Sequence, residues 1–362
     1  MPVSSDTSPP PHPLLRCSVI AVAVTALAIA FAYVAGWLTP QRLTPQRMVS
    51  ALQTNSGLYP GYRRNHAKGV CVAGYFEGNG AASAYSTASV FEKARTPVLG
   101  RFSIPGGNPY APDGSTPVRA LGLRFNLPNG QQWRTAMINT PVFIVSTPEA
   151  FNQLTVATRP DPATGKPDPA RAGAFFASHP ETAAFLGWAK TNKPSASFAT
   201  DRYDALNAFY FVDTHGQQHP VRWRFEPEAK DEAGAGPKAD DNDYLSQDLR
   251  QRLATTPQRW RLLVTLAAPG DPTNDPTKAW PADRTTIDAG TLVIENEQAQ
   301  DNAPCRDINF DPTILPAGII VSDDPLLPAR SAAYADSYLR RTREEAHIPG
   351  TTPAATPKPE TK

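Results

Sequence analysis

Two segments of this sequence each place one reactive side chain beside an apolar run. Residues 62–69 (YRRNHAKG) place His66 after two arginines and just before the run that begins at Val70. Imidazole ionises near neutral pH, so His66 could take up and return a proton during a reaction. Residues 138–145 (INTPVFIV) place Asn139 before a second run, where its carboxamide could donate a hydrogen bond. Taken alone, each residue also has a structural explanation, as a hydrogen-bonded strand start or a turn residue.

A third segment, residues 330–341, pairs an arginine with a tyrosine at helical spacing. Arg330 and Tyr334 are four residues apart, so on a helix the guanidinium can reach the phenol oxygen. A neighbouring guanidinium favours the ionised phenol, which is a hard anionic ligand suited to ferric iron. Tyr338 lies one turn further on but has no arginine four residues before it, which makes it a weaker candidate. The structural alternative is a basic helix whose tyrosines pack against the core.

In combination, these segments resemble the haem catalase family. His-Ala-Lys-Gly, Asn-Thr-Pro-Val-Phe and Arg-x-x-x-Tyr occur in the family's order, which is far more specific than any one of them alone. The resemblance covers residues 48–345 and includes the segments at 101–103, 118–125, 209–213, 275–281, 289–293 and 310–319. Two features depart from the family pattern: Tyr62 stands where a glutamate is usual, and Arg64 and Asn65 replace apolar residues before His66.

The resemblance implies a role for each of the chemically distinctive residues. It makes His66 the acid/base on the distal side of the haem, with Asn139 as its hydrogen-bonding partner and Ser103 orienting its imidazole. On the other side it makes Tyr334 the ligand of the iron, supported by Arg330, and tyrosine is the axial haem ligand in catalases.

The resemblance also implies residues that hold the haem itself. Arg63, Arg101 and Arg341 match positions at which catalases place arginines on the haem propionates. Phe143 and Phe151 are expected to line the distal side. The implied cofactor is haem, with haem b as the expected type.

The position of the ligand segment predicts a particular branch of the family. The sequence ends fewer than 30 residues after Tyr334, whereas large catalases continue with a C-terminal extension. The resemblance is therefore to the minimal, catalase-related peroxidases. It implies reduction of hydrogen peroxide through a ferryl intermediate with small organic electron donors, and weak catalase activity. The alternatives are a hydroperoxide isomerase on a catalase-like fold, a non-catalytic haem-binding or sensing module, and a haem-free scaffold.

Composition limits both the partners and the fold. The 35 Lys and Arg nearly balance 34 Asp and Glu, so charge gives no reason to expect nucleic acid as a partner. Proline accounts for 39 of 362 residues, about twice its usual share, which excludes a fold dominated by long helices. The resemblance leaves a homodimer open as the assembly state.

Short apolar runs bounded by turn residues indicate an antiparallel sheet or barrel. We expect strands at 70–76, 118–126, 140–145, 208–213, 221–226, 259–266 and 291–296, and helices at 180–191, 243–254 and 329–347. With the resemblance, the fold class is α+β: a catalase-like closed antiparallel β-barrel with surrounding helices, preceded by one N-terminal transmembrane helix.

The membrane helix is predicted at residues 18–38, an uncharged apolar stretch with Tyr33 and Trp37 near its end. A cleaved signal peptide is the alternative. We expect a single-pass inner-membrane protein with a periplasmic haem domain. The predicted layout is a disordered tail at 1–17, the anchor, a linker at 39–50, the haem domain at 51–347 and a disordered tail at 348–362.

The remaining cysteines, histidines and carboxylates give weaker signals. Cys17 lies in the apolar stretch, which leaves Cys71 and Cys305 as one candidate disulfide that the sequence does not decide. The histidines at 215 and 219 flank a Gly-Gln-Gln turn, which argues against a zinc site. The carboxylates at 323 and 324 precede a proline and are expected in a solvated loop.

Overall fold

The computed structural model describes residues 13–34, 37–39, 42–230 and 241–347. The chain forms two compact units, residues 1–44 and 45–362. Residues 1–12 of the predicted N-terminal tail and the whole predicted tail at 348–362 lie outside the described residues.

The first unit contains one long apolar helix, α1 (Pro13–Val34). Its stretch Leu15–Val34 has 20 residues, none of them buried by protein, and would be about 30 Å long, which matches the hydrocarbon core of a bilayer. Apolar side chains around the whole helix are unfavourable in water, so this segment suits either a membrane span or a signal sequence. The helix begins within the predicted N-terminal tail and ends four residues before the end of the predicted anchor.

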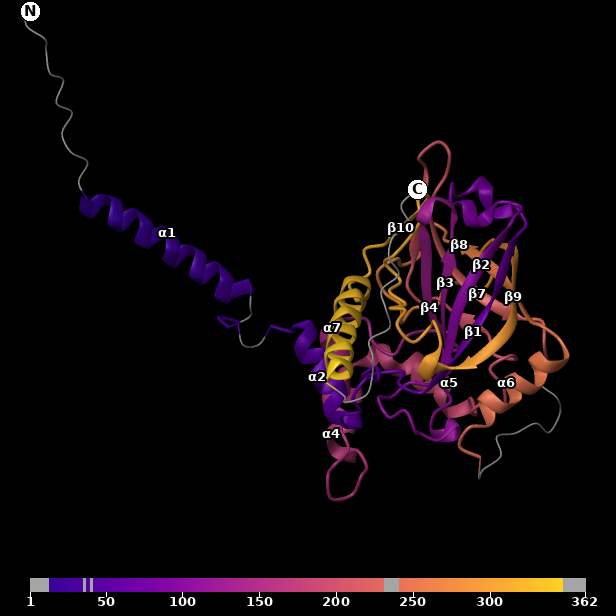
Figure 1. The fold of residues 1–362 in the computed structure, drawn as a ribbon, viewed down its shortest axis with the longest axis horizontal. Coiled ribbons are helices and arrows are strands. Elements are labelled where there is room, and N and C mark those ends of the chain that lie inside the picture. The colour runs from indigo at the N-terminus through magenta and orange to yellow at the C-terminus, as the bar shows by residue number, and fades with distance from the viewer. Residues whose placement is uncertain (1–12, 35–36, 40–41, 231–240, 348–362) are drawn as a thin grey trace, which may run out of the picture. The chain divides into compact units, whose positions relative to one another are not determined.

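An antiparallel β-barrel forms the centre of the second unit (Figure 1). The strands are β1 (Gly69–Gly78), β2 (Arg95–Ser103), β3 (Ala120–Asn126), β4 (Gln132–Ile138), β5 (Tyr203–Asp204), β6 (Phe209–Val212), β7 (Gln218–Pro227), β8 (Gln258–Leu266), β9 (Thr286–Ala299) and β10 (Ile319–Val321). Eight of them pair in the order β7-β5-β4-β3-β2-β1-β9-β8, and β8 pairs with β7 to close the barrel. Strands β6 and β10 extend from β7 outside this ring.

Aromatic side chains fill the interior of the barrel because alternate residues of each strand point inward. Trp133 on β4 is fully buried and stacks on Phe125 of β3, with the two ring centroids 4.6 Å apart. Trp223 of β7 meets Trp133 edge-on at 5.2 Å. The barrel is therefore a packed core, and ligand chemistry belongs at its margin, where the helices lie.

Six helices of the second unit surround the barrel: α2 (Pro45–Ser56), α3 (Pro148–Ala157), α4 (Pro169–Ser178), α5 (Ala183–Thr191), α6 (Tyr244–Thr255) and α7 (Leu326–Ala346). Helix α2 packs against α7 and α3, and α6 packs against β9 (Figure 1). Prolines begin α2, α3 and α4, where their missing N–H is not needed. The high proline content is thus compatible with these short helices.

Three local predictions were wrong. Strands β2 and β4 were not predicted, because polar residues occupy buried positions in both, Thr96 and Arg101 in β2 and Thr135 in β4, and these interrupt the alternation of apolar and polar residues. Residues 140–145 were predicted as a strand but form irregular chain. Pro141 cannot donate to a strand ladder, and this apolar run instead packs beside α3. Residues 45–50, predicted as linker, belong to α2, where Met48 and Val49 are buried.

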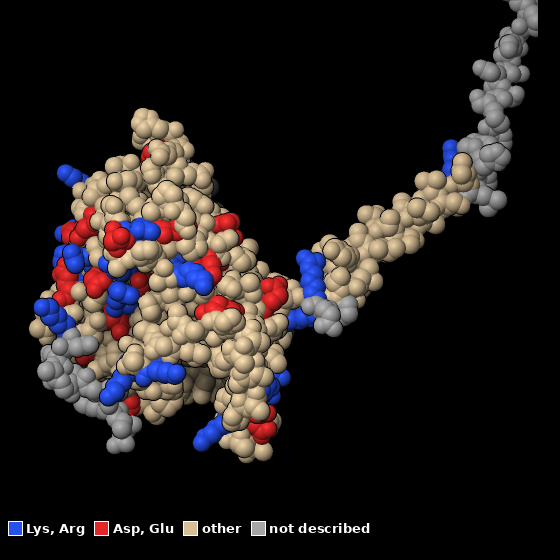
Figure 2. Space-filling view, turned by 180° about the vertical axis from the view of Figure 1, so that it is seen from behind, with Lys and Arg blue, Asp and Glu red and all other residues tan. Residues whose placement is uncertain are grey.

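Charged side chains are mixed over the face of the second unit seen in Figure 2, where blue and red groups alternate. Such mixing is what a net charge near zero leads one to expect.

Candidate active site

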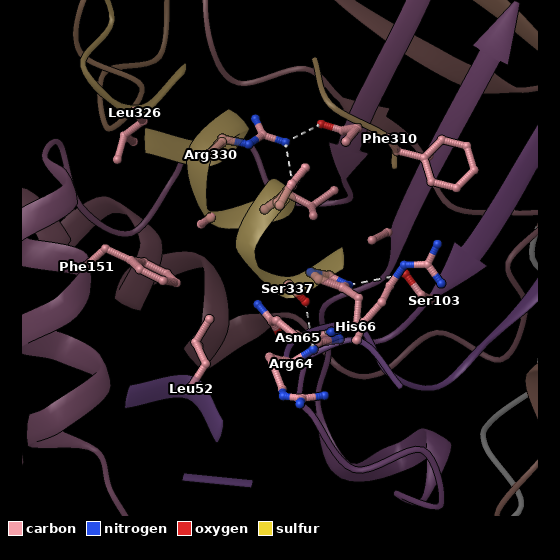
Figure 3. Close-up of a pocket in the computed structure, with 18 of the residues that line it drawn as sticks. Leu52, Arg64, Asn65, His66, Ser103, Phe151, Phe310, Leu326, Arg330 and Ser337 are labelled. Atoms are coloured by element: carbon pink, nitrogen blue, oxygen red, sulfur yellow. Dashed lines mark hydrogen bonds between the residues drawn. The ribbon is translucent and has the colours of Figure 1, made fainter. Parts of the chain in front are cut away.

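A cavity of about 410 Å³ opens between one end of the barrel and the helices α2, α3, α5 and α7 (Figure 3). This volume lies in the range of about 300–1,000 Å³ that is typical of cofactor and small-molecule sites. Much of its wall is apolar, with Leu52 from α2, Phe151 from α3 and Phe185 from α5. Nine of the ten residues predicted from the sequence line it: Arg63, His66, Arg101, Ser103, Phe143, Phe151, Arg330, Tyr334 and Arg341.

A clamped turn just before β1 holds His66 at the cavity wall. The backbone φ of His66 is +55°, a left-handed conformation that a residue other than glycine adopts only where neighbouring contacts enforce it. Here Asn65 Oδ1 accepts hydrogen bonds from the backbone N–H of His66 at 3.0 Å and of Gly106 at 2.7 Å. The Ala67 N–H donates to the Gly106 carbonyl at 2.8 Å. These contacts fix the direction of the imidazole.

The environment of His66 keeps its imidazole neutral. Nδ1 lies 3.2 Å from the Ser103 hydroxyl at the end of β2, the contact that the predicted orienting role of Ser103 requires. Burial lowers the pKa of His66 from 6.5 to about 3, because protein encloses the ring except on the cavity side. The positive charges of Arg101, Arg330 and Arg63 act in the same direction, in that order.

One face of α7 supplies a second group of polar residues. Arg330, Tyr334, Tyr338 and Arg341 all line the cavity, as expected for residues three, four or seven apart on a helix. The Arg330 guanidinium donates to the Tyr334 hydroxyl at 3.2 Å, which is the pairing that the sequence predicted. Tyr338 instead lies under the Arg341 guanidinium, 4.7 Å from the ring centroid. Arg330 therefore has a direct contact with Tyr334 and not with Tyr338.

Two further residues, Asn207 and Asp324, hold Arg330 in place and were missed in the sequence. The Arg330 guanidinium donates to Asn207 Oδ1 at 2.5 Å, and Asn207 Nδ2 donates to Asp324 Oδ2 at 2.7 Å. Asp324 is only 1% exposed, so its predicted place in a solvated loop was wrong. Burial raises the pKa of Asp324 above its usual value, while the hydrogen bond from Asn207 and the charge on Arg330 oppose that shift. No local sequence signal links residues 117 positions apart.

The three arginines assigned to haem propionates all line the cavity, lie close enough to repel one another, and have fewer carboxylates than positive charges around them. Within the described part of the chain, no carboxylate lies within 4.0 Å of the Arg63 or Arg101 guanidinium. Arg341 meets one, the half-exposed Asp307, at 3.3 Å. Burial, with repulsion from Arg341, lowers the pKa of Arg101 to about 9. Burial, with repulsion from Arg101 and Arg341, lowers the pKa of Arg63 as well. This arginine group is a ready site for an anion.

Neutral oxygens solvate the arginine group in place of carboxylates. Arg63 donates to three backbone carbonyls, those of Cys305, Arg306 and Ile308, at 3.2, 2.9 and 2.8 Å. Arg101 donates to the side-chain oxygen of Gln300 at 2.5 Å and to the Ala67 carbonyl at 3.0 Å. Carbonyl dipoles stabilise a buried guanidinium only in part, so net positive charge remains.

The structure does not place Asn139 where the prediction put it. Its Nδ2 donates to the Pro117 carbonyl at 3.1 Å and to Asp201 at 3.3 Å, and its Oδ1 accepts from the Arg119 N–H at 2.8 Å. The residue that lines the cavity at this point is Ile138, the last residue of β4. Because successive strand residues point to opposite faces, the cavity receives the branched alkyl side chain of isoleucine rather than an amide.

The remaining sequence expectations have clear outcomes. Phe143 and Phe151 stack with ring centroids 6.0 Å apart and together form an apolar part of the wall. Cys71 and Cys305 form a disulfide with a Cα–Cα distance of 5.5 Å. Among the described residues no group of three His, Cys, Asp or Glu side chains could hold a metal, and His219 pairs with Asp213 at 3.0 Å instead.

The low pKa of His66 predicts a specific pH dependence of stability. Between pH 6.5 and about pH 3 the unfolded chain protonates His66 while the folded protein does not, so the free energy of unfolding falls as the pH falls through this window. In His66→Gln this component should be absent. Urea unfolding at pH 7.5 and 4.5 should show the wild type losing more stability than the variant, by about 2–3 kcal/mol. Equal losses would contradict the neutral, buried imidazole.

Comparison with known proteins identifies the family to which this chain is similar. The catalase family model matches residues 60–359. The chain is 39% identical to a catalase-related peroxidase of Synechococcus elongatus, over 90% of this chain and 96% of that protein. It is 32% identical to a catalase-related peroxidase of Mycolicibacterium paratuberculosis, over 83% of this chain and 95% of that protein.

Solved structures agree on the fold. Catalase A from Saccharomyces cerevisiae superposes with a TM-score of 0.70 at 20% identity, over 78% of this chain and 62% of the yeast chain. The closed eight-stranded antiparallel barrel and its helices, which the sequence predicted, are therefore confirmed. With a family model that spans most of its length, the chain belongs to the catalase family, the haem-dependent oxidoreductases that act on peroxide.

Proposed function

We propose that this protein is a haem peroxidase that reduces hydrogen peroxide with electrons from small organic donors and dismutates peroxide only slowly. One observation carries the proposal: a single cavity is lined by the neutral imidazole of His66, by the Arg330–Tyr334 pair of α7 and by a buried arginine group without matching carboxylates. Each of these features has a use when a planar, dianionic, iron-carrying group occupies the cavity.

The residues present fit haem on electrostatic grounds. Buried guanidiniums that repel each other and lack ion-pair partners require an anion, and the two propionates of haem b would supply two negative charges. We assign Tyr334 as the oxygen ligand of the iron, because its hydroxyl faces the positive charge of the Arg330 guanidinium, which donates a hydrogen bond to it. When bound, haem supplies the redox chemistry: iron accepts oxidising equivalents from peroxide and passes them to a donor.

His66 is the residue that we assign to proton transfer. With Nδ1–H donating to the Ser103 hydroxyl, Nε2 keeps its lone pair and can accept a proton from one oxygen of hydrogen peroxide. The same Nε2 then returns the proton to the other oxygen, so that this oxygen can leave as water; bound haem would supply the two electrons that the cleavage needs and would retain the remaining oxygen atom. A proton shuttle of this kind favours turnover over passive haem storage.

Anion binding would also improve His66 as a base. Arg101 and Arg63 are two of the three charges that lower its pKa, and both belong to the arginine group. Carboxylates bound there would offset these charges and raise the pKa of His66 from about 3 toward neutrality. Occupancy of the site and basicity of the imidazole are thus coupled.

The contacts of Arg330 hold its positive charge next to the oxygen of Tyr334. Asp324 and Asn207 orient the guanidinium, and its second nitrogen also donates to the Ala136 carbonyl at 3.1 Å. A guanidinium fixed at both nitrogens keeps its hydrogen bond aimed at the Tyr334 oxygen.

The apolar wall supports organic molecules as electron donors. Side chains from α2, α3 and α5, among them Leu52, Phe151 and Phe185, line the cavity on its helical side. Apolar and aromatic surface attracts small aromatic compounds more than it attracts peroxide or water. Ile138, in the position where an amide was predicted, adds to this apolar character.

We further propose an oxidising location for the second unit, with α1 as a single inner-membrane span and the haem domain in the periplasm. The Cys71–Cys305 disulfide supports this location, because structural disulfides persist in the periplasm and are rare in the cytosol. The layout that we propose keeps an anchor, a short linker and one haem domain, with the domain beginning at Pro45 where α2 starts.

The deciding experiment is an absorption spectrum of the purified protein with and without haem. The wild type and Tyr338→Phe should show a Soret band of tyrosinate-ligated ferric haem, whereas Tyr334→Phe should lose that spectrum or the haem. Tyr338 is a matched control because it lines the same cavity without contacting Arg330. A tyrosinate spectrum that survives Tyr334→Phe and disappears in Tyr338→Phe would reassign the ligand, and no haem binding at all would overturn the proposed function.

Proton transfer can be tested by comparing two alanine variants. His66→Ala should retain haem but react with peroxide about 10²–10⁴-fold more slowly, as expected for loss of a general acid/base. Asn139→Ala should lower stability while changing the peroxide reaction less than about threefold, because its side chain is bonded outside the cavity. Stopped-flow absorbance measures both rates. A normal rate in His66→Ala would remove the assignment.

The preference for organic donors predicts a ratio of two activities. With saturating peroxide and an aromatic amine or phenol dye, dye oxidation should exceed oxygen evolution from peroxide alone. An oxygen electrode and a spectrophotometer measure the two rates on the same sample. Faster oxygen evolution would identify the protein as a catalase in activity.

A further inference from the structure

The Cys71–Cys305 disulfide connects backbone segments that position the arginine group, Arg63, Arg101 and Arg341. Cys71 is on β1, where its register partner across the β1–β2 ladder is Arg101. Cys305 begins the short stretch 305–308, whose carbonyls accept the hydrogen bonds of Arg63. The disulfide therefore joins the strand pair that carries one arginine to the segment that holds another.

The segment 305–308 also positions the third arginine. The Arg306 carbonyl accepts from Arg341 Nη1 at 2.7 Å as well as from Arg63 at 2.9 Å. Two guanidiniums of like charge are thus held side by side by one short stretch of backbone. A small displacement of this backbone would remove hydrogen bonds from both, at a place where repulsion already drives them apart.

Among the described residues the segment has few other polar contacts, and one of them, the Asp307–Arg341 ion pair at 3.3 Å, also runs to the arginine group. It forms neither helix nor strand, and its internal hydrogen bonds are the turns from Arg306 N–H to the Ala303 carbonyl and from Ile308 N–H to the Cys305 carbonyl. The Arg306–Glu345 ion pair is partly exposed to solvent, which weakens it. A small apolar cluster that includes Cys71, Cys305 and Ile308 packs beneath it. The disulfide links the segment 305–308 covalently to strand β1 of the barrel.

We propose that the Cys71–Cys305 disulfide is a positioning element of the anion-binding end of the cavity, and that its reduction loosens the hold on the cofactor carboxylates. This inference rests on the proposed function, since the anion is taken to be the propionates of haem. The disulfide acts through Arg63 and Arg341 and touches no reacting atom. The protein would then hold haem more tightly in an oxidising compartment than in a reducing one.

The reduction is a balanced two-electron step. A phosphine reductant attacks one sulfur and breaks the S–S bond, and with one water it becomes a phosphine oxide while Cys71 and Cys305 become thiols. A phosphine is preferable to a thiol reagent in the test, because a thiolate could itself bind the haem iron.

Haem affinity is the first measurement. Haem-free protein is reduced with the phosphine, desalted without air and titrated with haemin beside the oxidised protein. The double variant Cys71→Ala/Cys305→Ala is treated in the same way, and Cys17→Ser serves as the matched control, because Cys17 is an exposed cysteine of α1. We expect haem dissociation, measured by transfer to apomyoglobin, to be about 10–100-fold faster in the reduced protein and in the double variant. Cys17→Ser should match the wild type.

A second measurement separates positioning from general stabilisation. In an Arg63→Ala background, most of the effect of removing the disulfide on haem dissociation should disappear, because one of the groups that it positions is gone. A disulfide that only stabilised the fold would give additive effects instead. Hydrogen exchange supplies a readout that needs no haem: the Arg306 and Ile308 amides should exchange faster after reduction, while the barrel amides of β3 remain protected.

The outcomes distinguish this inference from the proposed function. If the oxidised protein binds no haem, the proposed function fails. If oxidised and reduced protein bind haem equally well, or if the effect remains fully additive with Arg63→Ala, the proposed function stands and this inference is wrong. If the double variant loses its far-UV circular dichroism, the reduced wild type decides the result.

Discussion

Like charges that are taken out of water repel each other strongly, and this constraint governs the cavity. Arg63, Arg101 and Arg341 all line the cavity, and their hydrogen-bond partners are mainly neutral carbonyls and one glutamine, with a single half-exposed carboxylate, Asp307, at Arg341. Backbone dipoles compensate a buried guanidinium only in part. A bound anion would offset the remaining energetic cost of burying these positive charges. The charges of Arg101 and Arg63 also add to the effect of burial, which is the main cause of the low pKa of His66.

The two chemically distinct sides of the site are built in different ways. His66 depends on a strained, clamped turn, in which Asn65 and Gly106 hold a left-handed backbone in place. Tyr334 depends on the regular spacing of a helix and on a chain of hydrogen bonds that ends at buried Asp324. The turn orients a single side chain, that of His66, whereas the helix aligns several side chains along one face. Each element therefore suits the group that it carries.

Ile138 gives the cavity a character that differs from the one predicted. An amide at this point would offer a hydrogen bond to peroxide, whereas a branched alkyl side chain offers only apolar surface. In the proposed reaction, proton transfer therefore depends on His66 and on its contact with Ser103. Together with the phenylalanines of the wall, this apolar surface is the reason for proposing organic molecules as electron donors.

The sequence by itself determined the family, the barrel and most of the residues that meet in the cavity. It could do so where the physics is local: Arg330 and Tyr334 share a helix face because they are four residues apart, and a histidine beside a strand start stays there in any fold. Only the tertiary structure decided what depends on distant partners. At the end of β4, Ile138 faces the cavity and Asn139, the next residue, faces away from it. Which of the two faces the cavity is set by the pairing of β4 with β3 and β5. The contacts of Arg330 with Asn207, and of Cys71 with Cys305, join segments more than 100 residues apart, and no local pattern encodes such meetings.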